Sequence, residues 1–152
     1  MLKLKIANNR GEAAMREIKF KGLAIDDSGW AYGYLFTGNN CINGTLSTHY
    51  YIGTFDNYYE VDPETVGQFI DFYDKNGKEI YEGDWVEIKN PECQVQKAIL
   101  QGVIVFRYGS FGINIKKVIQ WDGYSKGIEP REMMWFLNLV NNKEIEVIDN
   151  EF

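Results

Sequence analysis

Short apolar runs separated by turn residues recur along the whole chain, and this pattern constrains the fold more than any other feature. The clearest case is the segment 74–77, where Asn76-Gly77 lies between two apolar runs. Asn-Gly is the strongest short hairpin signal, because both residues accept positive φ. Ile and Val together number 25, against 14 for Leu and Ala, which favours strands over helices. The chain is therefore expected to be all-β.

Other segments of the chain predict further elements by the same reasoning. Alternating or apolar runs predict strands at residues 16–25, 30–36, 50–55, 58–61, 66–73, 85–88, 97–108, 111–115, 116–121 and 145–148. Turns are expected at residues 26–29, at 37–41 and at Gly109. Asp62 before Pro63 indicates a turn or a helix N-cap. One helix is predicted over residues 129–138, where Pro130 lies near the start.

The order of these elements suggests how the chain is divided. Many short strands at near-regular spacing are typical of a small barrel or sandwich. We predict a β-rich part at residues 15–62 and a second domain at 63–152, with one or two short helices in all. Residues 1–14 are basic and precede a second plausible start at Met15. They are interpreted as an extension or an alternative start, and a genuine first strand is the other interpretation.

The net charge of −6 is unevenly distributed. Residues 56–92 contain eleven acidic and three basic side chains, a net charge of −8, whereas the rest of residues 15–152 is neutral. Such a field repels phosphate backbones and disfavours non-specific nucleic-acid binding. It would suit a basic partner or a divalent cation, or simply form a solvated acidic face.

Composition excludes several classes of protein. Two Cys, Cys41 and Cys93, and one His, His49, exclude a disulfide scaffold, a four-ligand zinc site and any mechanism that needs two imidazoles. No run approaches the length of a membrane span and no signal peptide opens the chain, so a cytoplasmic protein without membrane contact is expected. No glycine-rich phosphate-binding motif occurs.

The acidic cluster and the lone imidazole are the candidates for chemistry. The cluster contains Asp71, Asp74, Glu79, Glu82 and Asp84, which could hold Mg²⁺ or act in acid–base hydrolysis. Asp74 and Glu79 flank the predicted hairpin turn, however, and a calcium loop starting at Asp74 would have Trp85 where a Glu is needed. We therefore expect no metal, no cofactor and no catalytic residue, and we expect His49 near Cys41 to be a packing or surface residue.

Aromatic residues are unusually frequent and could form a binding platform. The candidates are Trp30, Tyr32, Tyr34, Tyr50, Tyr51, Tyr58 and Tyr59. Such a platform would stack bases or hold a peptide. Cross-strand and core packing is the expectation for them instead.

Residues 61–88 carry a recognisable motif: Thr65-Val66-Gly67-Gln68, then residues 74–77, then residues 80–84. This order resembles the signature of the YopX family of phage and prophage proteins, and the similarity extends over residues 15–152. One departure is residues 69–72, where the family usually has Thr-Gly-Leu. The resemblance implies an all-β fold with a C-terminal SH3-like barrel, and it implies no established activity.

We interpret the motif as architecture, with Asn76-Gly77 as the turn, Gly83 as a special backbone position, and Tyr81 and Trp85 as anchors. Its residues are Thr65, Val66, Gly67, Gln68, Asp74, Asn76, Gly77, Tyr81, Gly83, Asp84 and Trp85. The leading hypothesis is a non-enzymatic protein-interaction module in a host cytoplasm, with a second copy in a homo-oligomer among its candidate partners. The alternative is a nucleic-acid-associated protein or a DNA mimic acting through residues 56–92, and an enzyme using the acidic cluster is the third.

Overall fold

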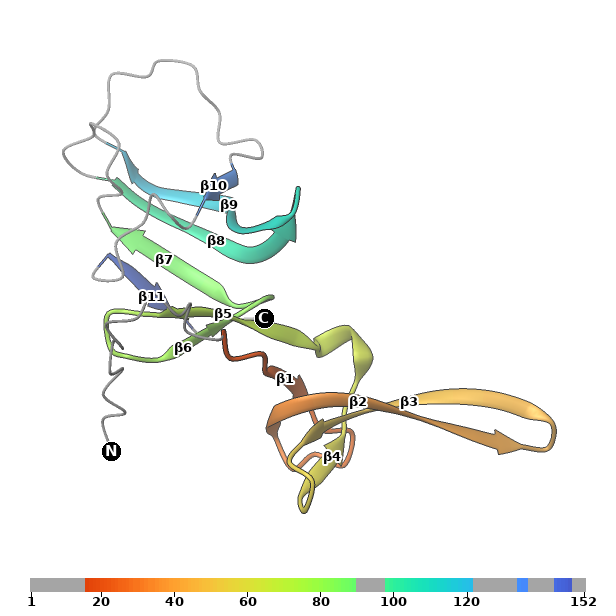
Figure 1. Cartoon of the computed structure of the whole chain (residues 1–152). Helices are drawn as coiled ribbons and strands as arrows, with labels where there is room; N and C mark the ends of the chain where they lie inside the picture. Colours follow the sequence, from red (N-terminus) through yellow and green to blue (C-terminus); the bar gives the residue numbers. More distant parts are fainter. Residues whose placement is uncertain (1–15, 90–97, 122–133, 137–143, 149–152) are drawn as a thin grey trace.

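The computed structural model describes residues 16–89, 98–121, 134–136 and 144–148 (Figure 1). The first sheet has the strand order β4-β3-β2-β1-β5-β6. Its strands are β1 (Phe20–Leu23), β2 (Trp30–Ile42), β3 (Thr45–Gly53), β4 (Tyr58–Glu60), β5 (Gly67–Tyr73) and β6 (Glu79–Tyr81). A 3-10 turn, η1 (Pro63–Thr65), precedes β5, and Asp62 caps it by accepting a hydrogen bond from the Glu64 N–H at 3.0 Å. The predicted N-cap at Asp62 is confirmed.

The second sheet has the order β10-β9-β8-β7-β11. Its strands are β7 (Trp85–Lys89), β8 (Ala98–Arg107), β9 (Ser110–Trp121), β10 (Met134–Phe136) and β11 (Ile145–Val147). Every strand pair in both sheets is antiparallel. The all-β prediction is confirmed. The SH3-like closure is not, because the strands of the described residues form two open sheets.

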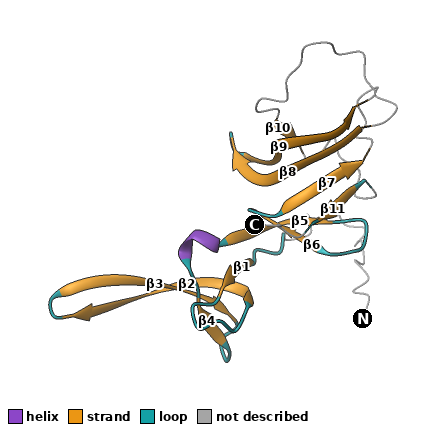
Figure 2. Cartoon of the chain, turned by 180° about the vertical axis from the view of Figure 1, so that it is seen from behind, coloured by secondary structure: helices purple, strands orange, loops and turns teal. Residues whose placement is uncertain are grey.

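The larger core lies between the second sheet and the β5–β6 hairpin. Ile70 and Ile80 of the hairpin pack against Val86, Ile104 and other buried aliphatic side chains of β7, β8, β9 and β11. Burial of apolar surface is the main force that holds the hairpin there. Strand β1 pairs with β5, so hydrogen bonding of the first sheet also continues across the predicted boundary at residues 62 and 63. The β5–β6 hairpin therefore joins the two sheets (Figure 2).

A smaller core lies on one face of the first sheet. It consists of Ala31, Ile52 and Val61, with Leu35 and Tyr50 packed against it. Alternation along β2 directs Ala31 and Leu35 into this core and directs Trp30, Tyr32, Tyr34 and Phe36 to the opposite face. The small core leaves the other face of β2 uncovered by any described layer.

Three predictions about local structure were wrong. The expected turn at residues 37–41 is part of β2, which pairs with β3 from Tyr34↔Gly53 to Ile42↔Thr45. The chain turns instead at Asn43 (φ 52°) and Gly44 (φ 79°), because both residues take the positive φ of a two-residue hairpin turn. The Gly and Asn residues at positions 38–40 have the composition of a turn, but none of them has positive φ.

The predicted helix over residues 129–138 was the second error. Residues 134–136 form β10, which pairs with Gly112–Asn114 of β9, and the rest of that range lies outside the described residues. The apolar run lacks helical periodicity, and the open edge of β9 offers it a pairing partner. Residues 111–115 and 116–121, expected as separate strands, form one strand, β9. Residues 1–14 also lie outside the described part.

Candidate functional site

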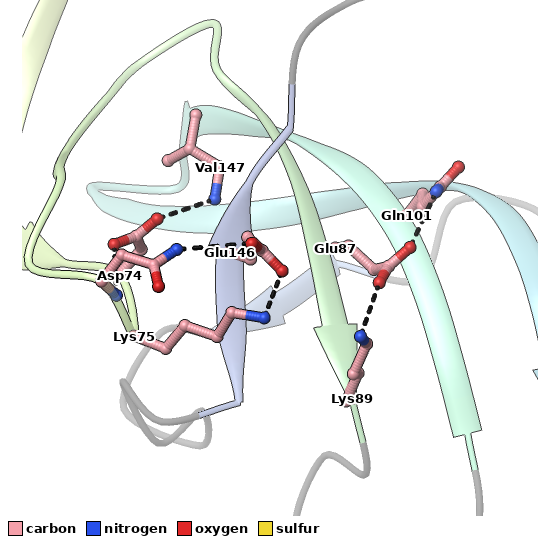
Figure 3. Close-up of polar contacts among 8 residues, drawn as sticks. Asp74, Lys75, Glu87, Lys89, Gln101, Glu146 and Val147 are labelled. Carbon is pink, nitrogen blue, oxygen red and sulfur yellow. Dashed lines mark hydrogen bonds and ion pairs between the residues drawn. The ribbon is translucent and has the colours of Figure 1, made fainter.

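The predicted hairpin turn at residues 74–77 docks onto β11. The Asp74 carboxylate is buried and accepts three backbone hydrogen bonds: Oδ1 from Asn76 and Lys78, both at 2.8 Å, and Oδ2 from Val147 at 3.2 Å. Figure 3 shows the last of these contacts beside the ion pair of Lys75 with Glu146. Burial raises the pKa of Asp74, but the three N–H donors outweigh it and hold the pKa below its ordinary value.

The turn itself has the conformation that its sequence predicts. Gly77 has φ 79°, as expected for Asn76 or Gly77, and its N–H donates to the Asp74 carbonyl at 2.9 Å. Asn76 Nδ2 donates to Glu146 at 3.3 Å, which adds a second contact to β11. The turn is therefore tied to a strand about seventy residues later in the chain.

The start of the motif joins η1 to the two neighbouring strands. The Thr65 hydroxyl donates to the Asp62 carbonyl at 2.7 Å and accepts from the Leu23 N–H at 2.8 Å. A Cβ at Gly67 would collide with the carbonyl oxygen of Glu82, so this position admits only glycine without a backbone shift. Val66 packs on the smaller core, and the Gln68 carbonyl accepts from the Glu82 N–H at 2.9 Å.

The end of the motif surrounds an open cavity of about 640 Å³, which we call the corner pocket. Its lining comes from both sheets: Lys21, Trp30, Tyr32, Lys78, Glu79, Tyr81, Gly83, Asp84, Trp85, Val147 and Ile148. Gly83, at φ 85°, and Asp84 join the sheets through backbone hydrogen bonds with Ile104. Four of the eleven motif residues, Tyr81, Gly83, Asp84 and Trp85, therefore line one cavity.

Two acidic side chains of the corner pocket, Glu79 and Asp84, form ion pairs with lysines of the segment before and within β1. Lys21 forms an ion pair with Asp84, which also accepts from the Tyr81 N–H at 2.9 Å, and the Lys21 ammonium lies 4.5 Å from the centre of the Trp30 ring. Lys19 pairs with Glu79, which accepts from the Tyr81 hydroxyl at 2.7 Å. The pocket is lined by charged side chains of both signs and by aromatic rings, an arrangement suited to stacking and hydrogen bonding.

Proton affinities in the pocket follow from these contacts. Burial and the hydrogen bond to Glu79 raise the pKa of Tyr81, and burial with the nearby Asp84 charge raises the pKa of Tyr32. Burial also disfavours the charged form of Glu79, but the bonds from Lys19 and Tyr81 outweigh it and lower the pKa of Glu79. Both phenols therefore stay protonated at neutral pH, and Glu79 stays ionised.

An aromatic face extends from this pocket over the first sheet. We define it by six side chains: Trp30, Tyr32, Tyr34 and Phe36 of β2, Tyr51 of β3 and Tyr58 of β4. Rings of Phe36, Tyr51 and Tyr58 contact one another with centroids 5.2–5.8 Å apart. The Tyr34 side chain is 67% exposed and borders a second cavity, of about 400 Å³, with Phe36, Phe55 and Tyr58. Cross-strand packing was predicted correctly here, but the face is also largely open to solvent.

The platform residues expected from the sequence are divided between two faces. Five of the seven lie on the aromatic face, whereas Tyr50 packs on the smaller core and Tyr59 pairs with Ile52. Phe36, which sequence reasoning missed, completes the face. Its signal was the spacing of Trp30, Tyr32, Tyr34 and Phe36 at every second residue, with smaller residues between them.

A hydrogen-bonded series of Ser47, His49 and Glu60 also escaped the sequence analysis. Ser47 Oγ lies 2.9 Å from His49 Nε2, and His49 Nδ1 lies 2.5 Å from Glu60 Oε1. The order resembles that of a serine hydrolase, but neither cavity described above is lined by any of the three. Ser47 and His49 are two positions apart on one strand, so β alternation alone places them side by side. Cys41 is exposed and pairs with Leu46, not with His49.

Comparison with protein families decides which family this is. A family model described as YopX protein matches residues 29–151. The chain belongs to the YopX family. The match covers β2 to β11, and therefore every motif residue, but it begins after β1, which supplies Lys21 to the corner pocket. No curated protein matches the chain.

The YopX motif residues gather where the two sheets meet, and several acidic residues around them are buried or contact a basic side chain. Asp74 and Asp84 are buried, Glu79 binds Lys19, Glu60 contacts His49, and Glu87 lies near Lys89. Asp71, another candidate, is exposed. Within the described ranges no group of three or more His, Cys, Asp or Glu side chains could hold a metal ion. Cys93 and Glu92 lie outside those ranges.

The departure from the YopX pattern at residues 69–72 coincides with a bulge. The pairing of β5 with β6 shifts register between Phe69 and Tyr73, and Asp71 within this interval has φ 59°. Glycine is the usual residue at such a position.

No helix of the described chain is long and apolar enough to cross a membrane.

Proposed function

We propose that this YopX-family chain is a non-enzymatic protein-interaction module that binds its partner through the aromatic face. The observation that carries this proposal is the row of solvent-exposed rings on β2, continued by Tyr58 and Phe55 around the 400 Å³ cavity. Exposed aromatic clusters of this kind are costly to leave in water and are enriched where proteins bind one another.

The charges beside the aromatic face favour a protein partner over a nucleic acid. Lys19 and Lys21, the basic side chains beside the face, are already paired with Glu79 and Asp84. These two ammonium groups are therefore already neutralised within the molecule, and the net charge of −6 opposes the approach of phosphates. A partner that presents apolar side chains within a basic rim fits both the rings and the charge. Binding of this kind would take place in a host cell.

The alternative of a DNA mimic is not favoured by the positions of the acidic residues. Asp74, Glu79 and Asp84 are held by internal donors, so the 56–92 stretch does not present one continuous row of free carboxylates. An enzyme is not favoured either, because the hydrogen-bonded Ser47 lines neither of the two cavities in which a substrate would be held.

The test compares capture of host proteins by the full chain and two variants. Tyr34→Ser/Phe55→Ser removes two exposed rings that border the 400 Å³ cavity. Tyr108→Ser/Ile119→Ser is the matched control, because both side chains are exposed on the second sheet. We expect at least one host protein to be captured by the wild type and the control and lost with the face variant. If no captured protein distinguishes the face variant from the control, the proposal is wrong.

A further inference from the structure

The distal part of the β2–β3 hairpin extends beyond the rest of the first sheet. We call residues 35–49 the hairpin arm. Strand β1 pairs with β2 only over Trp30–Gly33, and β4 pairs with β3 only over Tyr51–Gly53. Figures 1 and 2 both show the arm as a two-stranded ribbon directed away from the second sheet. Among the described residues, no strand pairs with the outer edge of β2 over residues 35–42.

A hairpin in this position lacks the support that strands usually have. Residues 40–48 are all exposed, including Ile42 at 66% and Leu46 at 67%. An isolated two-stranded hairpin is marginally stable in water, and three or more strands with packing are normally needed. The unpaired N–H and C=O groups along β2 are also a template for another strand. The arm therefore presents an open strand edge with which a further strand can pair.

The distribution of charged residues favours the same strand of a second copy as the pairing partner. No Asp, Glu, Lys or Arg occurs between Ser28 and Phe55, although a quarter of the chain is charged. The excess negative charge of the chain lies in residues 56–92, so two copies repel each other there but not along this arm. Natural edges that must not pair with themselves usually carry Lys or Pro, and this edge has neither. The β3 edge is less suitable, because Glu60 lies beside it.

We propose that the hairpin arm is a self-association element in which the β2 edges of two copies pair antiparallel about a twofold axis. Such an isologous contact joins identical edges and closes at two chains. Backbone hydrogen bonds over residues 35–42 supply the contact, and the uncharged side chains of the arm allow the two backbones to approach. This inference does not rest on the partner-binding role of the aromatic face.

Sedimentation velocity of the full chain over a rising concentration series, with reductant present to keep Cys41 a thiol, tests the proposal. We expect the apparent mass to double as concentration rises. Thr37→Lys/Asn40→Lys places one ammonium on each face of the β2 edge and should keep the chain at the mass of one copy. The control Asn57→Lys/Tyr108→Lys adds the same charge at exposed positions outside the arm and should still double in mass.

A second variant separates loss of pairing from loss of folding. Deleting residues 39–42 and 45–48 joins Gly38 to Asn43 and Gly44 to His49. Gly38 and His49 are register partners, and they then flank the Asn-Gly turn as Ile42 and Thr45 do in the natural hairpin. The shortened hairpin keeps its Asn-Gly turn and its contacts with β1 and β4, and it should remain monomeric. A wild type that keeps the mass of one copy at all concentrations, or doubling in mass by either arm variant, would overturn the proposal.

Hydrogen exchange gives an independent readout on the wild type. Amides of residues 35–42 that face outward should exchange more slowly at high concentration than at low concentration, while amides of β8 should not change. Doubling in mass with no added protection over residues 35–42 would show that another surface joins the copies and would reject the arm.

Discussion

At the scale of single residues, Asp74 shows how the YopX motif acts on the fold. Its carboxylate satisfies three backbone N–H groups, two within its own turn and one on β11. A buried donor that loses its acceptor retains the full cost of leaving water. One side chain therefore fixes both the turn and its docking onto the second sheet.

Replacing Asp74 by Ala should lower the free energy of unfolding by about 2–4 kcal/mol, because three backbone hydrogen bonds to a buried, charged carboxylate are lost. Urea unfolding at neutral pH measures the change. Asp56→Ala is the control, since Asp56 is exposed in the β3–β4 turn, and it should change stability by less than about 0.5 kcal/mol. Equal effects at the two positions would contradict the role assigned to Asp74.

The same variant predicts a pH dependence. The pKa of Asp74 in the folded chain lies below its ordinary value of 3.8, so its stabilisation is present above that value and is lost as pH falls through the folded pKa. The difference in unfolding free energy between wild type and Asp74→Ala should be largest near neutral pH and should shrink below pH 3.8. A difference that stays constant through this acid range would show that the charge is not involved.

A substitution at Asp71 is predicted to raise the free energy of unfolding, whereas Asp74→Ala lowers it. Its φ of 59° lies in the left-handed region, where a side chain is strained and glycine is not. Asp71→Gly should therefore raise the unfolding free energy by about 0.5–1 kcal/mol, after the entropy lost by glycine on folding is subtracted. Thermal unfolding of Asp71→Gly beside Asp56→Gly checks this, and the second variant should not be stabilised. Destabilisation of Asp71→Gly would mean that its carboxylate supports the bulge.

At the scale of elements, the β5–β6 hairpin is the piece that unites the sheets. It pairs with β1 through β5 and places Ile70 and Ile80 in the larger core. Gly77, at φ 79°, closes its turn, and a Cβ added there would meet no other atom within 4 Å. Any cost of a larger residue at this position therefore comes from backbone strain alone.

Gly77→Val should destabilise the chain by about 1–3 kcal/mol, because a β-branched residue resists positive φ. Asn76→Val, at the neighbouring position without positive φ, is the comparison and should cost less. The urea midpoints of the two variants, each compared with that of the wild type, measure the two costs. A neutral result for Gly77→Val would show that the turn can be built in another way.

Elements were predictable from the sequence where one local signal was stronger than its rivals. Alternation located β1, β5, β7 and β11, and Asn76-Gly77 located a turn. The turn at residues 37–41 was misplaced because several Asn and Gly residues compete there, and pairing register decided among them. The strand β10 was taken for a helix because its partner edge, on β9, is set by tertiary structure.

The candidate site was predictable only in part. The motif residues were identified by resemblance, but their meeting at the corner pocket depends on contacts between segments such as Lys21 and Asp84 that are 63 positions apart. The aromatic side chains were expected to be covered. Alternation shows which side chains share a face, but it does not show whether a second layer covers that face.

At the scale of the whole molecule, chemistry and binding are separable by experiment. A chain without an enzymatic role should hydrolyse an activated ester such as p-nitrophenyl acetate no faster than an equal concentration of free imidazole, and Ser47→Ala should not change the rate. Loss of most of the activity in Ser47→Ala, with folding intact, would instead make the Ser47, His49 and Glu60 series a catalytic site.

The molecule thus combines a rigid corner, an exposed aromatic face and an uncharged arm. The YopX motif builds the corner, and the aromatic face that we propose as the binding surface lies beside it on the first sheet. The two roles make different demands on substitutions. We expect changes to Asp74 to act on stability and, if the proposed function holds, changes to Tyr34 and Phe55 to act on partner binding.

Quantitative capture of the same host partner by folded Asp74→Ala and by Tyr34→Ser/Phe55→Ser tests this division most directly. We predict that Asp74→Ala, kept below its unfolding transition, captures as much partner as the wild type, while the face variant loses it and remains as stable as the wild type. Retention of the partner by the face variant together with its loss from folded Asp74→Ala would contradict the account.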